Sequence, residues 1–149
     1  MRNRGNATAP PAVSMGTIRL VSVNPDPGAS LTVQRCIVNG LPRDCVAWSG
    51  AFEVTLAGDI RWPVLTVSFY NGTKLCGYAA ATVDATLPAG VATTFRPSSI
   101  SLSDEFGSFQ PPCALPAKAT RMVAQLWTDD NWNFSVRQEF PIQYAFVKP

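Results

Sequence analysis

The chain has 149 residues, which is enough for one domain with a single core and short for two. Hydrophobic residues make up 46% of the sequence and charged residues only 15%, which excludes intrinsic disorder because so many apolar side chains need burial. The formal net charge is +2, from 12 basic and 10 acidic residues. So small a charge attracts neither nucleic acid nor an anionic membrane strongly, and we expect neither as a partner.

The first sixteen residues differ in composition from the rest of the chain. Residues 1–16 carry proline, alanine and asparagine without hydrophobic periodicity, and we interpret them as a flexible linker or N-terminal extension. A single ordered domain is expected from residue 17 to residue 149. No run of 18 apolar residues occurs in the sequence, so no membrane span is predicted.

Within the domain, short segments rich in β-branched and aromatic residues recur between glycine, proline, asparagine and aspartate, a pattern that predicts strands. The strongest hairpin signal is the pair VLTVSFY and KLCGYAAATV, separated by Asn71-Gly72-Thr73, because Asn-Gly tolerates the positive φ angles of a tight turn. The predicted strands span residues 17–23, 31–38, 51–57, 64–70, 74–83, 92–103, 119–128 and 136–147. Seven or eight such strands with no helical period predict an all-β fold, an antiparallel two-sheet β-sandwich.

The order of these segments also carries a resemblance. The hairpin VLTVSFYNGTKLCGYA, the segment AG..TTF..SSISLS and the segment LPA..TRMVAQLW resemble the immunoglobulin-like or fibronectin type III-like accessory modules of bacterial secreted proteins. The resemblance covers roughly residues 17–147 and implies a β-sandwich that is appended to, or displayed on, a larger assembly. The chain departs from antibody domains because it lacks their Cys-Trp-Cys spacing, and the resemblance implies no site residues.

Four cysteines stand at Cys36, Cys45, Cys76 and Cys113. The chain has no histidine and no closely spaced cysteine pair, so neither a zinc site nor an activated catalytic thiol is expected. We predict two disulfides, Cys36–Cys45 and Cys76–Cys113, and therefore an oxidising compartment: extracellular, periplasmic or cell surface.

The first predicted disulfide closes a short loop. Its cysteines flank the segment IVNGLPRD, and the Asn39-Gly40 dipeptide within it is able to turn the chain back on itself. We interpret this disulfide as a clip around a surface loop, and the Cys76–Cys113 pair as a tie between the second hairpin strand and a proline-rich loop.

Catalysis has few candidate residues in this sequence. Without histidine the commonest general base is missing, and we predict no enzyme activity, no metal and no cofactor. The carboxylate doublets at 104–105 and 129–130 fit solvated turns better than an acid–base pair. Calcium binding by the TDDNWN segment, with Asp129 and Asp130 as ligands, stays open.

Aromatic residues give the remaining site hypothesis. Trp48, Trp62 and Trp132 lie beside predicted turns, where a tryptophan either covers a core or stacks on a sugar ring. The candidate binding residues are Trp62, Tyr78 and Trp132.

Two functions follow from these features. The first is a non-catalytic structural or adhesive module that binds a protein partner or self-associates, for example as the subunit of a surface filament. The alternative is a carbohydrate-binding module that uses exposed tryptophan and tyrosine side chains.

Overall fold

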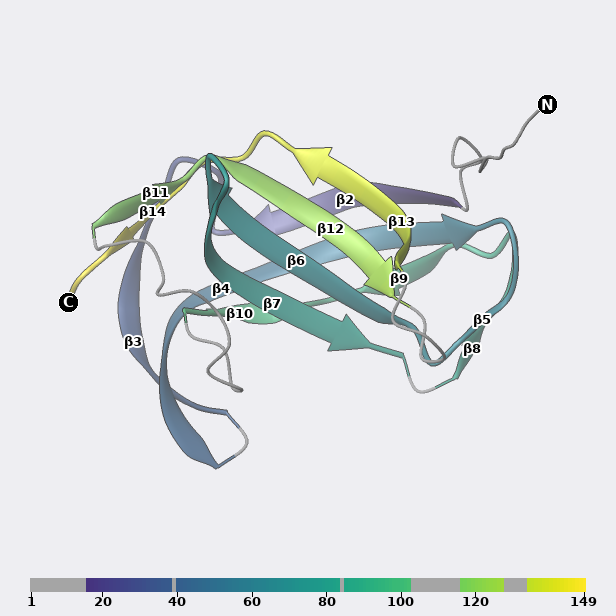
Figure 1. Cartoon of the computed structure of the whole chain (residues 1–149), viewed down its shortest axis with the longest axis horizontal. Helices are drawn as coiled ribbons and strands as arrows, with labels where there is room; N and C mark the ends of the chain where they lie inside the picture. Colours follow the sequence, from purple (N-terminus) through teal and green to yellow (C-terminus); the bar gives the residue numbers. More distant parts are fainter. Residues whose placement is uncertain (1–15, 39, 84, 103–115, 128–133) are drawn as a thin grey trace.

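The computed structural model describes residues 16–38, 40–83, 85–102, 116–127 and 134–149 (Figure 1). The predicted extension lies outside this part of the chain, except that Gly16 already belongs to the first described strand. The strands are β2 (Gly16–Asn24), β3 (Ser30–Val38), β4 (Leu41–Leu56), β5 (Ile60–Arg61), β6 (Val64–Asn71), β7 (Lys74–Thr82), β8 (Thr86–Leu87), β9 (Thr93–Phe95), β10 (Ser98–Ser101), β11 (Ala117–Ala119), β12 (Arg121–Trp127), β13 (Phe134–Phe140) and β14 (Tyr144–Val147).

The fold is all-β, as predicted, and most of the described strands belong to one hydrogen-bonded sheet. Within the described residues, hydrogen bonds join eleven strands into one curled sheet in the order β11-β14-β3-β4-β10-β7-β6-β12-β13, and β2 and β9 also pair with β4. The short strands β5 and β8 form a second sheet. All pairs are antiparallel except β14 with β3, which are parallel.

The long strand β4 explains why the sheet is continuous. Its first residues, up to Ser49, pair with β3 on one side and β10 on the other, and its later residues pair with β2 and β9. A single strand of sixteen residues therefore belongs to both halves of the sheet. The strand predicted at 51–57 is only the end of β4, and the interpretation of the chain before it as a surface loop was wrong.

Gly50 shows why this stretch looks like a turn in the sequence. A Cβ atom at Gly50 would lie 2.8 Å from the Trp48 ring and 2.9 Å from the Phe52 ring, so the strand needs glycine at this position to let both rings pack. The Gly50 N–H donates to Pro97 O at 3.0 Å. The glycine therefore reflects close packing within a strand and not a chain reversal.

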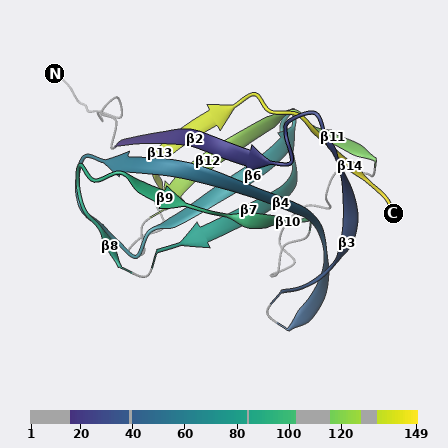
Figure 2. The same ribbon diagram turned by 180° about the vertical axis from the view of Figure 1, so that it is seen from behind.

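The sheet curls until strands that are distant in its order approach one another. Strands β11 and β12 are separated only by Thr120, whose N–H donates to Tyr70 O at 2.8 Å. Because β11 pairs with β14 and β12 pairs with β6, this short stretch of chain connects two strands that are far apart in the sheet order. At the other side β13 lies beside β2 (Figures 1 and 2), and the Phe52 and Phe140 rings pack there with centroids 6.1 Å apart.

Four aromatic side chains form the centre of the core. The Phe69 ring of β6 contacts Trp48 of β4 edge to face at a centroid distance of 5.1 Å, and contacts Tyr144 and Phe146 of β14 at 6.3 Å each. The placement of Trp48 beside a turn was wrong, because Trp48 lies within the strand β4, and only 4% of it is exposed. Its indole Nε1–H donates to Tyr144 OH at 3.2 Å, and that hydroxyl donates to Pro25 O at 2.7 Å. Both polar atoms are satisfied inside the core.

We expect Phe69→Ala to lower the free energy of unfolding by about 3–5 kcal/mol, because it removes the ring that the other three aromatics pack against. Urea denaturation measures the change. Val91→Ala is the control: Val91 is 50% exposed and should cost at most about 0.5 kcal/mol. Equal effects of the two substitutions would show that Phe69 is not central.

Burial raises the pKa of the Tyr144 phenol above 10.0, and the nearby Asp26 carboxylate adds to this, while the hydrogen bond from Trp48 opposes it. The folded protein thus holds the proton at a pH where the unfolded chain releases it, so this contribution to stability is present below pH 10 and declines above it. We expect the stability difference between wild type and Tyr144→Phe to shrink between about pH 8 and about pH 10.5 in urea titrations. A constant difference would contradict this.

Candidate functional site

The predicted aromatic site does not assemble from its two described members. Trp62 is 50% exposed and lies between β5 and β6, with a positive φ of 53° and its N–H bonded to Ala85 O at 3.1 Å. Tyr78 is half-buried in the middle of β7. Val64, just after Trp62, pairs with Thr82, and Tyr78 lies four residues further back along β7, which is roughly 13 Å. Trp132 lies outside the described residues.

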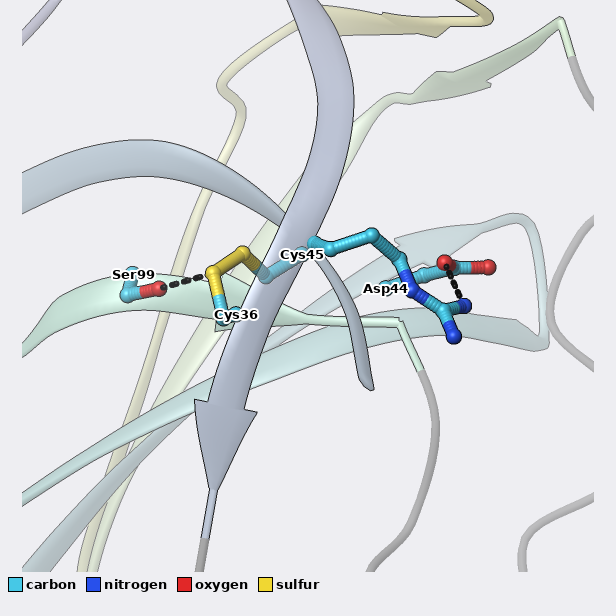
Figure 3. The surroundings of a disulfide bond; sticks show 5 residues. Cys36, Asp44, Cys45 and Ser99 are labelled. Carbon is cyan, nitrogen blue, oxygen red and sulfur yellow. Dashed lines mark hydrogen bonds and ion pairs between the residues drawn. A yellow bond between two sulfur atoms is a disulfide. The ribbon is translucent and has the colours of Figure 1, made fainter. Parts of the chain in front are cut away.

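The predicted disulfide between Cys36 and Cys45 is confirmed. It joins β3 to β4 across a Cα–Cα distance of 6.0 Å, within the usual range for a disulfide (Figure 3). Cys36 lies opposite Arg43 and Cys45 opposite Gln34, so the bond runs diagonally between two paired strands, and the segment it encloses is a β-hairpin where a surface loop was expected. The disulfide therefore links two strands that are already paired by their backbones.

The second predicted disulfide stays a prediction. Cys76 is only 1% exposed, and no described cysteine is a free thiol. Its predicted partner Cys113 lies outside the described residues.

A β-bulge in β4, where two of its residues face Ser99 of β10, lies close to the confirmed disulfide. The pairing of β10 with β4 shifts register between Ser98 and Ile100, and Ser99 between them has a positive φ of 66°. Its hydroxyl lies 3.9 Å from Cys36 Sγ and donates to it, since a disulfide sulfur carries no hydrogen (Figure 3). The bulge thus turns Ser99 toward the sulfur pair.

Beyond the disulfide, β3 and β4 continue as a hairpin that projects from the rest of the sheet (lower left in Figure 1). We call this projection the arm and define it as residues 35–38 of β3 and 41–44 of β4, which pair with one another in antiparallel register. The arm and its disulfide form the candidate functional site. The arm was not predicted from the sequence because residues 41–44 were interpreted as loop.

One face of the arm continues the core-facing side of the sheet. At its base Val33 and Val46 lie opposite each other and are buried. Next come Arg35 and Asp44, whose guanidinium and carboxylate groups form an ion pair at 3.1 Å. Ile37 follows, 72% exposed.

The other face of the arm carries the disulfide and a second exposed apolar residue. Cys45 is fully buried and Cys36 partly buried, so the bond lies where the arm leaves the body. Leu41 lies on the same face near the turn and is 52% exposed. Single exposed apolar residues are ordinary on protein surfaces, but Ile37 and Leu41 both lie near the end of the same projecting hairpin.

The described residues hold no cluster of metal ligands, and they line a small hollow beside β14. No three histidine, cysteine, aspartate or glutamate side chains gather there as a metal site, and the carboxylate doublets at 104–105 and 129–130 lie outside them, as does the possible calcium segment. A hollow beside β14 has a volume of about 110 Å³ and is lined by Gly28, Lys118, Gln143, Tyr144 and Ala145. This is well below the roughly 300 Å³ at which typical ligand pockets begin.

Comparison with known proteins assigns no role to the arm or to any other part of the chain. No protein-family model matches the chain, and no curated protein matches its sequence. The resemblance to immunoglobulin-like modules is neither supported nor opposed by this result. The part of the chain that the structure describes also contains no helix with the length and apolar character needed to cross a bilayer.

We expect the double substitution Cys36→Ser with Cys45→Ser to lower the free energy of unfolding by about 2.7 kcal/mol, the chain-entropy value for a loop this short. Hydrogen exchange followed by mass spectrometry should show the loss of protection concentrated in residues 35–44. Uniform loss across the sheet, or no loss in the arm, would show that the disulfide does not hold the arm in place.

Proposed function

We propose that this protein is a non-catalytic structural or adhesive module that works outside the cell, in the periplasm or on the cell surface, and that it binds a protein partner through the arm. The observation that carries the proposal is the exposure of Ile37 and Leu41 at the end of a projecting hairpin. An apolar side chain of this size contributes about 1.5–3 kcal/mol when fully buried, so covering even one of them would supply a useful part of a binding free energy.

The disulfide supports the same role because it fixes the arm before any partner arrives. A preorganised element loses less conformational entropy on binding than a free loop does. The ion pair between Arg35 and Asp44 also connects the two strands of the arm at 3.1 Å, although both side chains are largely exposed and the pair adds little stability by itself.

The cysteine chemistry supports the proposed compartment. Disulfides persist in oxidising environments and are rare in reducing ones, and the Cys36–Cys45 bond is the structural feature that supports this compartment. We include in the proposal the second disulfide, Cys76–Cys113, and an immunoglobulin-like arrangement of the curled sheet, which its antiparallel hairpins around one aromatic core support.

Carbohydrate binding through Trp62 has weaker support. A stacking platform for a sugar chain needs aromatic rings on one surface, and the half-buried Tyr78 lies roughly 13 Å along β7 from Thr82, the residue that pairs with Val64 near the exposed Trp62.

Site-specific photo-crosslinking tests the proposal. A benzophenone side chain at position 37 should form covalent protein adducts in the cells or medium that naturally contain this chain. The same group at position 94 is the matched control, because Thr94 is an exposed strand residue on the body of the sheet. Adducts at 37 and none at 94 are expected. Absence of adducts at 37, or equal labelling at both positions, would overturn a binding role for the arm.

A further inference from the structure

Among the described strands, none pairs with the outer edge of β3 along the arm. Strand β14 pairs with this edge only at residues 30–32, and β14 ends at Val147, opposite Thr32. From Val33 onward the described residues provide no ladder partner on this side, since β4 occupies the opposite edge of β3. An uncovered edge presents N–H and C=O groups that are able to pair with another extended chain.

The backbone orientation shows which residues present these groups. Asp44 O accepts a hydrogen bond from Leu102 N at 2.9 Å, so the backbone of Asp44 is turned away from β3. Arg35 lies opposite Asp44, and in an antiparallel pair opposite residues either exchange hydrogen bonds or both point outward. Arg35 therefore points its N–H and C=O to the open edge, and by alternation Ile37 does so too. Ala29 lies an even number of residues before Arg35 and confirms this orientation, because its carbonyl oxygen accepts a hydrogen bond from Ala145 N at 3.1 Å on the same edge.

We propose that this edge pairs with the same edge of a second copy of the chain, antiparallel and about a two-fold axis at Cys36. Each Arg35 then lies opposite Ile37 of the second copy. The inference deepens the proposed function and rests on it, because it names the protein partner of the arm. The result is a four-stranded sheet that joins the arms of two molecules, closed by symmetry and with identical contacts on both sides.

Charge and sterics select this register over its neighbours. A two-fold axis at Arg35 would set two arginines directly opposite each other, and like charges in that position are destabilising. An axis at Gln34 would bring residue 37 of the second copy opposite Leu31, on the edge that β14 already occupies. An axis at Ile37 would set Arg35 opposite the turn of the second copy, which leaves fewer backbone hydrogen bonds between the two edges. The axis at Cys36 keeps four backbone hydrogen bonds, two at each Arg35–Ile37 pair.

The side chains of the arm are compatible with this pairing. The two Ile37 residues become diagonal neighbours on one face, which covers apolar surface that is 72% exposed in the single chain. Each Arg35 is already paired with Asp44 of its own chain at 3.1 Å, so the approaching edges carry no unbalanced charge between them. Leu41 lies on the opposite face and takes no part in the pairing.

Sedimentation velocity over a range of protein concentrations tests the proposal. We expect the wild-type protein to show a monomer–dimer equilibrium and Ile37→Pro to weaken the dimer about thirtyfold or more, since it removes two of the four hydrogen bonds. The Ile37 N–H points away from β4, so proline at this position leaves the β3–β4 ladder intact. Ile37→Lys is a second variant that keeps the N–H and sets a charge near Arg35 of the other copy, and it should also weaken the dimer.

Leu41→Ser is the matched control. It removes the other exposed apolar residue of the arm but leaves the β3 edge unchanged, so the dimer should persist. A wild-type protein that stays monomeric at millimolar concentration, or a dimer that Ile37→Pro and Ile37→Lys leave intact, would overturn the edge pairing. If position 37 crosslinks to a different protein while the chain stays monomeric, the proposed binding role stands and the second copy is excluded as its partner.

Discussion

The length of β4 determines how the rest of the molecule is arranged. Sixteen residues run as one strand, and neighbours on both edges hold most of it: β3 and β10 near its start, β2 and β9 near its end. Because the strand is continuous, the same backbone that anchors the core also carries the arm outward. The curl of the sheet and the position of the arm therefore have one origin.

The core and the arm depend on different kinds of interaction. Around Phe69, ring packing and the Trp48–Tyr144–Pro25 hydrogen bonds connect residues far apart in the sequence and fix the body of the sheet. Within the part of the chain that the structure describes, no such aromatic cluster includes the arm, and its two strands are joined by their backbone ladder, a disulfide and an exposed ion pair. A covalent bond is the appropriate device there, since an isolated two-stranded hairpin is marginally stable in water.

Local patterns predicted the elements, whereas long-range contacts decided their assembly. The β6–β7 hairpin was predictable because alternation and the Asn71-Gly72 turn both act within a few residues, and the Cys36–Cys45 bond because Asn39-Gly40 lies between its cysteines. The long β4 was not predictable, since close packing of rings around Gly50 requires a residue that otherwise marks turns. Because β4 was not predicted, the arm was not predicted either. The exposure of Ile37 indicates a binding surface only once the strands beside it are known.

The central claim is that the arm is an ordered pair of strands that directs the β3 edge outward. Nuclear Overhauser effects between α protons test it most directly, because these protons approach closely only at pairs of an antiparallel ladder that are not joined by hydrogen bonds. The account predicts a strong effect between the α protons of Arg35 and Asp44 and another between those of Ile37 and Pro42. Strong effects between the α protons of Cys36 and Arg43 instead, or none within the arm, would contradict it.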